Sequence, residues 1–375
     1  MTSEWNHFAL GEITELVIDY RGKTPKKLGG DWCKQGYRAL SAKNIKTGRI
    51  VQAETIRYID ESLYRKWMKD EVQRGDILIT SEAPFGQIFF WDSDEKIVLS
   101  QRLFCVRIKP EYDARFIYYY MTTPEFQSEL DGRATGTTVI GLRQPELMKC
   151  VIRCPEIQEQ KVIAAILSSI DAKIIANEKV NDNLQQQAQA IYSSMFIDNP
   201  DPAWSHGHLS DLITVKYGKD HKKLADGIYP VYGSGGIMRY VERPLYNKES
   251  VLIPRKGTLN NVMYVNQPFW SVDTMFYTEM KLPNVAKFVY HFVKAKDLAS
   301  MNAGSAVPSM TTDILNAMEI VIPSASALEE FESLVAPMYE AMEANDVQSK
   351  ALSQMRDTLL PKLMSGEIDV SDIQL

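Results

Sequence analysis

The chain has 375 residues, 45% of them hydrophobic and 24% charged, which is enough for two or three domains with separate cores. No apolar run approaches the ~20 residues that span a membrane, and the opening MTSEWNHFAL lacks the basic and apolar regions of a secretory signal, so we expect a cytoplasmic protein without a membrane segment. The net charge of −6 is concentrated in residues 323–375, which hold 3 basic and 10 acidic side chains. Basic surfaces are therefore compatible with the rest of the chain.

Three segments recur in the same order in the two halves of the chain. They are WNHFALGEI (5–13) and WSHGHLSDL (204–212), DILIT (76–80) and SVLIP (250–254), and GTTVIGL (136–142) and GSAVPSM (304–310). The offset between matching residues falls from 199 to 174 and then to 168, so the first half carries about 31 additional residues. The sequence predicts one repeated scaffold with two different elaborations.

Short runs of β-favouring residues precede the third repeated segment in each half, separated by Gly, Pro and Asn. The runs are DILIT, QIFFW, KIVLS and LFCVRI in the first half and SVLIP, NVMYV, FWSV and MFYTEM in the second. A short helix is expected after each set, around 114–130 and 285–299. The sequence therefore predicts two mixed, strand-rich α+β domains.

After the third repeated segment, apolar residues recur at intervals of three and four, and the same pattern returns 168 residues later. This period predicts two amphipathic helices of about 40 residues, each roughly 60 Å long at 1.5 Å per residue. The residues expected along the seam between the helices are Ile163, Ile166, Ile170, Ile174, Asn177, Leu184, Ile191, Phe331, Leu334, Met338, Met342, Asn345, Leu352 and Leu359. Asn177 and Asn345 occupy matching positions, either to fix the register of the helices or as solvated residues at a bend.

The sequence contains none of the common signatures of a catalytic or cofactor site. YGSGGIM at 232–238 has the glycines of a phosphate-binding loop but not its Lys-Ser/Thr, and no GxGxxG follows a predicted strand. The five histidines lack HxxxH spacing, the four cysteines are dispersed and expected to be buried, and DSDEK at 92–96 is typical of a polar turn. We therefore expect no catalytic residue, no metal and no cofactor in this chain.

Basic and amide side chains cluster at related places in the two halves, in RGKTPKK (21–27) and the residues after it, and in KYGKDHKK (216–223) and PRKGTLNN (254–261). Lys and Arg neutralise phosphates, and Arg, Asn and Gln can form bidentate hydrogen bonds with base edges. The residues expected to contact DNA are Lys23, Lys26, Lys27, Arg38, Lys43, Asn44, Arg49, Lys219, Lys222, Lys223, Arg239, Arg255, Lys256 and Asn260. The alternative interpretation of each cluster is a solvated polar surface. Arg255 and Lys256 also belong to the repeated scaffold, so they can instead organise the domain.

The repeated loop, GTTVIGL and GSAVPSM, also has two interpretations. It can offer backbone N–H groups and hydroxyls to a phosphate, or it can form a turn between helix and strand with positive φ at Gly136 and Gly304.

The order of these motifs resembles the specificity (S) subunit of type I restriction–modification enzymes over nearly the whole chain. The resemblance rests on the W-x4-L-x-[ED]-[IL] opening of each half, YGSGGIMRYVERPLYNKESVLIPRKGT at 232–258, the G-[TS]-x-V loop, and helices such as PEIQEQKVIAAILSSIDAKI. It implies target recognition domains at 1–154 and 199–322, a central helical region at 155–198 that acts as a coiled-coil spacer, and a C-terminal helical region at 323–375 that packs antiparallel on it.

The resemblance further implies a non-catalytic protein whose two domains each read one half of a bipartite double-stranded DNA site. Two methyltransferase subunits would dock on the helices and supply S-adenosylmethionine chemistry at adenine N6. Two restriction subunits would add translocation and cleavage that depend on ATP and Mg.

Other functions remain open at this point. The chain can be a stand-alone S-like protein of another restriction system, a silent partner without a matching methyltransferase, or a coiled-coil adaptor that binds only protein. A self-sufficient methyltransferase is disfavoured because the chain has no [DN]PP[YF] motif.

Overall fold

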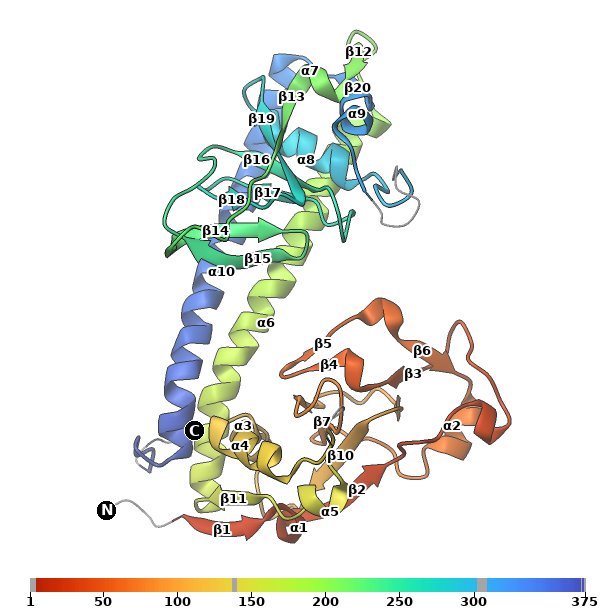
Figure 1. Ribbon diagram of the computed structural model, residues 1–375, viewed down its shortest axis with the longest axis vertical. Helices are drawn as coiled ribbons and strands as arrows, with labels where there is room; N and C mark the ends of the chain where they lie inside the picture. The colour runs from red at the N-terminus through yellow and green to blue at the C-terminus, as the bar shows by residue number, and fades with distance from the viewer. Residues whose placement is uncertain (1–4, 137–139, 302–308, 372, 374–375) are drawn as a thin grey trace. The chain divides into compact units, whose positions relative to one another are not determined.

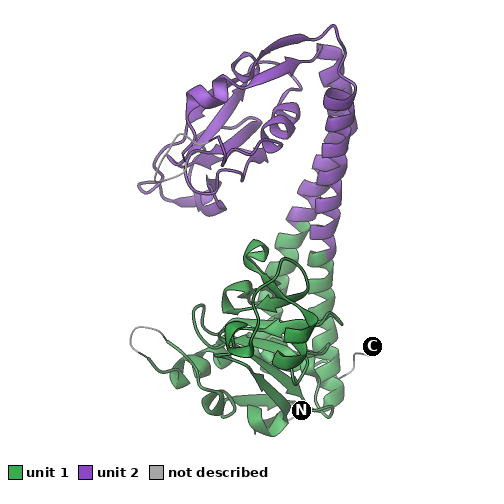
Figure 2. Ribbon diagram, turned by 90° about the vertical axis from the view of Figure 1, so that its right-hand side faces the viewer, with its two compact units in different colours: residues 1–175, 348–375 green, residues 176–347 purple. Residues whose placement is uncertain are grey.

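The computed structural model describes residues 5–136, 140–301, 309–371 and 373. The chain forms two compact units (Figure 2): unit 1 consists of residues 1–175 and 348–375, and unit 2 of residues 176–347. Each unit contains one strand-rich domain together with the adjoining parts of both long helices. The division therefore passes through the helices and not between the four segments predicted from the sequence.

Unit 1 contains three sheets and one short hairpin (Figure 1). A two-stranded sheet pairs β1 (Asn6–Ala9) with β11 (Val151–Cys154). A four-stranded antiparallel sheet has the order β2 (Thr14–Asp19), β10 (Leu103–Ile108), β7 (Ile77–Thr80) and β8 (Ile88–Phe90). A three-stranded sheet has the order β6 (Arg57–Ile59), β3 (Tyr37–Leu40) and β9 (Ile97–Leu99), with β3 and β9 parallel. The hairpin joins β4 (Ile45–Lys46) to β5 (Arg49–Ile50).

Unit 2 repeats the three sheets with the same strand orders. Its two-stranded sheet pairs β12 (Ser205–His208) with β20 (Glu319–Ile322), and its four-stranded sheet has the order β13 (Ile213–Tyr217), β19 (Met275–Met280), β16 (Ser250–Pro254) and β17 (Met263–Val265). Its three-stranded sheet has the order β15 (Gly236–Val241), β14 (Asp226–Gly233) and β18 (Trp270–Ser271), with β14 and β18 parallel. The internal repeat predicted from the sequence is therefore a repeat of topology.

Short helices connect these strands. They are α1 (Leu10–Ile13), α2 (Glu61–Trp67), α3 (Ala114–Met121), α4 (Pro124–Arg133) and α5 (Gln144–Leu147) in unit 1, and α7 (Leu209–Leu212), α8 (Ala286–Lys294) and α9 (Thr312–Asn316) in unit 2. The helix expected over 114–130 is two helices, because the Thr123 side chain accepts a hydrogen bond from the Phe126 N–H and Pro124 occupies the first turn of α4.

The repeated W-x4-L-x-[ED]-[IL] opening has a structural role in both units. The acidic side chain of the motif accepts the backbone N–H three residues earlier, from Ala9 to Glu12 at 2.6 Å and from His208 to Asp211 at 2.8 Å. This is the acidic half of a capping box, in which the third helical residue accepts the N-cap N–H, and it fixes the turn after the first strand of each domain.

The four-stranded sheet of each unit is buried on both faces. Successive residues of a strand point to opposite faces, so Ile77 and Ile79 enter the core beside α3 while Leu78 enters the core beside the three-stranded sheet. Val251 and Leu252 divide in the same way in unit 2. Burial on both faces explains why these strands appear in the sequence as continuous apolar runs.

The two long helices are α6 (Ile157–Ser193, 37 residues) and α10 (Ala325–Met364, 40 residues), close to the predicted length. In unit 1, Ile163 near the start of α6 shares a core with Leu363 near the end of α10. In unit 2, Tyr192 near the end of α6 shares a core with Phe331 near the start of α10. Within each unit, therefore, the two helices run antiparallel, as predicted.

The predicted seam is wrong at Leu334, whose surface is 47% exposed, whereas the adjacent Val335 is fully buried. The matching residues of α6 behave alike, because Leu167 is fully buried and Ile166 only partly. Both members of each pair are apolar, so hydrophobicity alone cannot distinguish a step of three residues from a step of four. Of the other predicted seam residues, Ile163, Ile170, Ile174, Asn177 and Phe331 are buried and Ile166, Leu184, Ile191, Met338, Met342, Asn345, Leu352 and Leu359 are partly buried.

Within the described part of the chain, none of the helices combines length and hydrophobicity to the degree that crossing a membrane demands.

Candidate nucleic-acid interface

Two of the predicted cations of the first domain are held by contacts within unit 1. Lys23 Nζ donates to the carbonyl oxygen of Trp67 at 2.7 Å and lies 3.8 Å from the centre of the Tyr20 ring, and burial lowers the pKa of this lysine. Lys27 Nζ donates to the carbonyl oxygen of Gly22 at 2.7 Å. Both amino groups therefore order the loop after β2.

Arg38 and Asn44 are also engaged inside unit 1. The Arg38 guanidinium donates two hydrogen bonds to the Glu95 carboxylate. Asn44 is only 1% exposed; its side-chain oxygen accepts the Ser41 N–H at 3.1 Å, and its side-chain nitrogen donates to Thr55 Oγ1 at 3.0 Å. The prediction that Asn44 contacts DNA is wrong for this conformation, because its amide is used to close a turn.

The other predicted cations of the first domain, together with Lys46, are exposed, and most of them lie close together on the β4–β5 hairpin and the turn before it. These are Lys43, Lys46 and Arg49, while Lys26 lies on the short 3₁₀ turn after β2. Lys46 and Arg49 are cross-strand partners. Lys46 is not among the contact residues expected from the sequence, but the hairpin register places it beside Arg49.

Two of the predicted contact residues of the second domain organise unit 2. Arg239 donates to the carbonyl oxygen of Leu224 at 2.8 Å and pairs with Asp226 at 2.9 Å. Asn260 donates to the Asp297 carboxylate at 3.0 Å. These side chains fix the start of β14 and the loop after β16.

The other predicted residues of the second domain lie at its surface. Arg255 is partly buried, lies 5.4 Å from the centre of the Tyr217 ring, and donates to the carbonyl oxygen of Asp273 at 3.3 Å. The four lysines among these predicted residues, Lys219, Lys222, Lys223 and Lys256, are exposed, and within the described part of unit 2 they have no ion pair. They are the strongest candidates for phosphate contacts in unit 2.

The repeated loop is joined to the loop after β7 or β16 by the same backbone contacts in both units. Leu142 N–H donates to the carbonyl oxygen of Ser81 at 3.0 Å, and Met310 N–H donates to that of Arg255 at 2.9 Å. Gly136 has a φ of +123°, as the turn interpretation predicts, whereas Gly304 and residues 137–139 lie outside the described residues. The described part of the repeated loop therefore shapes the domain, and whether it contacts phosphate stays a prediction.

The residues beside these joined loops have opposite charges in the two units. Glu82 forms a bridge with Gly141 and an ion pair with Arg102 at 3.2 Å, whereas Lys256 forms the matching bridge with Ser309. Glu82 and Lys256 are 174 residues apart, the offset already established for the preceding strands. An alignment of the two halves of the sequence would have shown this difference in charge.

In unit 1 a polar network links the domain to both long helices. Tyr119 of α3 donates to the Asp171 carboxylate of α6 at 2.7 Å, and Arg356 of α10 donates to the same carboxylate at 2.8 Å. Arg356 is partly buried and Tyr119 is buried.

Unit 2 has a neutral network at the matching place. His291 of α8 lies 2.8 Å from Gln189 Oε1 of α6 through Nδ1 and 3.0 Å from the Tyr339 hydroxyl of α10 through Nε2. Tyr339 is 168 residues beyond Asp171, which is the repeat offset. Burial lowers the pKa of His291 to about 4, so the imidazole is neutral at pH 7.

The asparagines predicted at the seam meet in unit 2. Asn177 donates to the carbonyl oxygen of Asn345 at 3.4 Å, and Asn345 donates to the side-chain oxygen of Asn181 at 2.8 Å. Asn177 is only 2% exposed. At these matching positions each amide donates to a group on the other long helix, which favours the interpretation that the two asparagines set the register of the helices.

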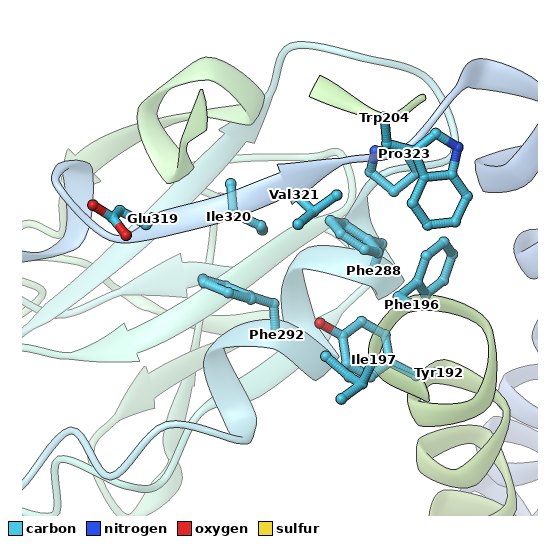
Figure 3. A pocket seen from close by; sticks show the side chains of 10 residues that line it. All are labelled: Tyr192, Phe196, Ile197, Trp204, Phe288, Phe292, Glu319, Ile320, Val321 and Pro323. Carbon is cyan, nitrogen blue, oxygen red and sulfur yellow. The ribbon is translucent and has the colours of Figure 1, made fainter. Parts of the chain in front are cut away.

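Unit 2 also contains an apolar cavity of about 160 Å³ between the end of α6, α8 and β20 (Figure 3). Its walls are mainly aromatic and aliphatic, with Tyr192, Phe196, Trp204 and Phe288 at one end and Glu319 as the one carboxylate. A single carboxylate does not provide the pair of carboxylates used in general acid–base catalysis.

The described residues contain no group of His, Cys, Asp or Glu with the geometry to hold a metal ion. Cys105, Cys150 and Cys154 are buried as expected, but Cys33 is exposed. DSDEK is the polar loop between β8 and β9, where Arg74 pairs with Asp92 and Asp94. YGSGGIM forms the turn of the β14–β15 hairpin.

Comparison with known proteins gives matches over both halves of the chain. The family model for the type I restriction modification DNA specificity domain matches residues 2–186 and 203–331. The MjaIX specificity subunit of Methanocaldococcus jannaschii is 24% identical over 344 residues, covering 80% of this chain and 79% of the relative. The HindI specificity subunit of Haemophilus influenzae is 20% identical over 418 residues, covering 80% and 88%.

One solved structure has the same fold. The crystal structure of the type I restriction–modification S subunit from M. genitalium superposes with a TM-score of 0.61 at 18% identity and covers 96% of each chain. The family model matches more than half of the residues, in two copies that follow the internal repeat. The chain therefore belongs to the family of type I restriction–modification specificity subunits.

Proposed function

We propose that this protein reads a bipartite double-stranded DNA site for a type I restriction–modification complex, with each strand-rich domain contacting one half-site. The observation that carries the proposal is the pairing of one repeated scaffold with different exposed side chains, most clearly Glu82 in unit 1 and Lys256 in unit 2. A repeated scaffold suits two DNA segments of the same shape, and different surface chemistry suits two different base sequences.

The phosphate contacts are assigned to exposed cations. In unit 1 these are Lys26, Lys43, Lys46 and Arg49, and in unit 2 they are Lys219, Lys222, Lys223 and Lys256, together with the partly buried Arg255. Lys23, Lys27, Arg38, Arg239 and Asn260 support these loops from within. Each neutralised phosphate adds about −0.9 to the slope of log affinity against log salt.

We assign the long helices the role of a spacer between the two half-sites. An α6 of 37 residues is roughly 55 Å long at 1.5 Å per residue. Removal of seven facing residues from each helix shortens the pair by roughly 10 Å and changes the helical phase by only about 20°. We expect the preferred spacer to shorten by about 3 base pairs at 3.4 Å each, and an unchanged spacer would contradict the role.

In this proposal the chain itself is non-catalytic. Two methyltransferase subunits dock on the helices and carry S-adenosylmethionine, and two restriction subunits carry ATP and Mg. The whole complex then acts in the cytoplasm. The relatives named above are specificity subunits of restriction enzymes, which supports this assembly.

Two experiments test the function. Adenine N6-methylation mapped in a host genome with and without this gene is expected to show a bipartite motif that disappears when the gene is deleted. Affinity of the purified complex for DNA is expected to fall steeply with salt. A salt slope near zero would instead favour a coiled-coil adaptor that binds only protein, and salt-dependent binding without gene-dependent methylation would favour a stand-alone or silent S-like protein.

A further inference from the structure

The outer face of the β14–β15 hairpin exposes large apolar side chains to solvent. Ile228 is 78% exposed, Met238 60% and Tyr240 39%. The inner face of the same hairpin packs Val231 and Val241 into a core. An exposed apolar face of this kind marks an interaction site or invites aggregation.

The backbone is built to present these side chains. The register of β14 shifts between Asp226 and Tyr229, and a Cβ on Gly227 would lie 2.4 Å from the Val241 carbonyl oxygen. Only glycine fits there, and the bulge turns the next residue, Ile228, outward. Met238 lies over Gly233, where a Cβ would be 2.5 Å from its sulfur.

The matching sheet of unit 1 has a different outer surface. Strands β3 and β6 pair as β14 and β15 do, but each face of the pair carries an arginine: Arg38 on one face pairs with Glu95, and the guanidinium of Arg57 on the other face lies 5.3 Å from the centre of the Trp32 ring. Two copies of one partner protein would need like surfaces on both units. Two different half-sites need unlike surfaces, so the difference favours DNA as the partner.

The net charge of the chain around the hairpin is positive, as expected for a surface that binds DNA. Residues 217–243 contain five basic and three acidic side chains, a net charge of +2 in a chain of net charge −6. Lys222 and Lys223 immediately precede the hairpin, and Lys219 N–H donates to the carbonyl oxygen of Ser271 in β18 at 2.8 Å. The lysines therefore lie before the central strand β14 and beside the edge strand β18.

We propose that the outer face of the β14–β15 hairpin enters the major groove of one half-site and reads the 5-methyl groups of thymine through Ile228, Met238 and Tyr240. This inference rests on the proposed function and adds the reading element and the group read. A two-stranded ribbon with strands about 4.8 Å apart fits a groove about 12 Å wide. β18 pairs only with Val231 and Tyr232, so the remainder of the hairpin is a free two-stranded ribbon. Thymine is the base that presents a methyl group in this groove.

The test replaces thymine by deoxyuridine, which removes only the methyl group. Each thymine of both mapped half-sites is replaced in turn, and binding is measured for the complex with its methyltransferase subunits. We expect affinity to fall about fourfold at one or more positions of one half-site, the factor that corresponds to burial of one methylene-sized group. The double variant I228S/M238A is expected to bind the thymine and deoxyuridine duplexes equally at those positions, with the other half-site unaffected.

The control is Leu282→Ser, which removes another exposed apolar side chain of unit 2 away from the hairpin. It is expected to keep the full response to deoxyuridine, and thermal unfolding verifies that both variants fold. An unchanged response in I228S/M238A, or no sensitive thymine, would overturn the inference. Weaker capture of methyltransferase subunits with an unchanged thymine response would show a protein-docking face instead. Absence of salt-dependent DNA binding by the wild-type complex would contradict the proposed function itself.

Discussion

Units 1 and 2 share strand orders and backbone contacts but differ in the polar groups placed on them. At the matching place the link between domain and helices is charged in unit 1, where Arg356 and Tyr119 meet Asp171, and neutral in unit 2, where His291 lies between Gln189 and Tyr339. One helical turn away, Lys287 of α8 adds an ion pair with Glu332 of α10 in unit 2. In each network the polar side chains form hydrogen bonds with one another. A polar group that has such a partner can be buried without a large cost in free energy. The backbone and the apolar cores therefore define the scaffold, and its polar chemistry is free to diverge.

The largest expected effect is a loss of stability, and it differs between two residues of α10 that are three positions apart. Phe331→Ala removes a fully buried ring from the core of unit 2 and is expected to lower the free energy of unfolding by about 3–5 kcal/mol. Leu334→Ala is expected to change it by less than about 0.5 kcal/mol, since Leu334 is 47% exposed. Denaturant titration measures the free energy of unfolding of both variants. Equal losses of stability would contradict the assignment of Val335, and not Leu334, to the seam between the helices.

The neutral network predicts acid sensitivity of unit 2. The folded-state pKa of His291, about 4, lies below the ordinary 6.5, so the unfolded chain binds the proton more tightly. The stability from this histidine is complete above pH 6.5 and is lost as pH falls towards 4, by about 3 kcal/mol in total. His291→Gln is expected to remove this component from the pH dependence of unfolding, and parallel pH profiles for the two proteins would contradict it.

The charged network predicts a smaller loss in unit 1. Asp171→Ala leaves the Tyr119 hydroxyl and the Arg356 guanidinium without their shared acceptor and is expected to cost about 2 kcal/mol, moderated because Asp171 and Arg356 are partly exposed. The matched change Tyr119→Phe removes a single hydrogen bond and is expected to cost about 1 kcal/mol. Denaturant titration of the two variants gives the comparison; a larger loss for Tyr119→Phe would contradict the central place of Asp171.

The smallest effect concerns DNA affinity at the joined loops. Lys256→Glu is expected to weaken binding to all sequences and to flatten the salt slope by about one unit, whereas Glu82→Lys is expected to steepen it by about one unit. Lys179→Glu, on the exposed surface of α6, serves as the control and is expected to leave the slope unchanged. Identical slopes for all four proteins would remove these loops from the interface.

The sequence predicted the scaffold well because repeated segments and helical periodicity are properties of the whole chain. It did not predict the β14–β15 hairpin, because the bulge at Gly227 interrupts the alternation that identifies a strand. The choice between Leu334 and Val335 failed because both are apolar.

The candidate interface was predicted less completely than the fold. Composition shows where cations cluster, but not that Lys23 is bound to the Trp67 carbonyl or that Asn44 closes a turn. The use of a polar side chain depends on backbone groups brought near it by folding. Exposure and pairing in the folded chain therefore select among residues that the sequence presents as equivalent.

The central claim is that each unit reads one half-site independently. The most direct test replaces residues 199–322 by the corresponding domain of another specificity subunit and maps adenine N6-methylation in cells that contain the matching methyltransferase. The account predicts a motif in which one half changes while the other half and the spacer stay the same. A change in both halves, or in neither, would contradict it.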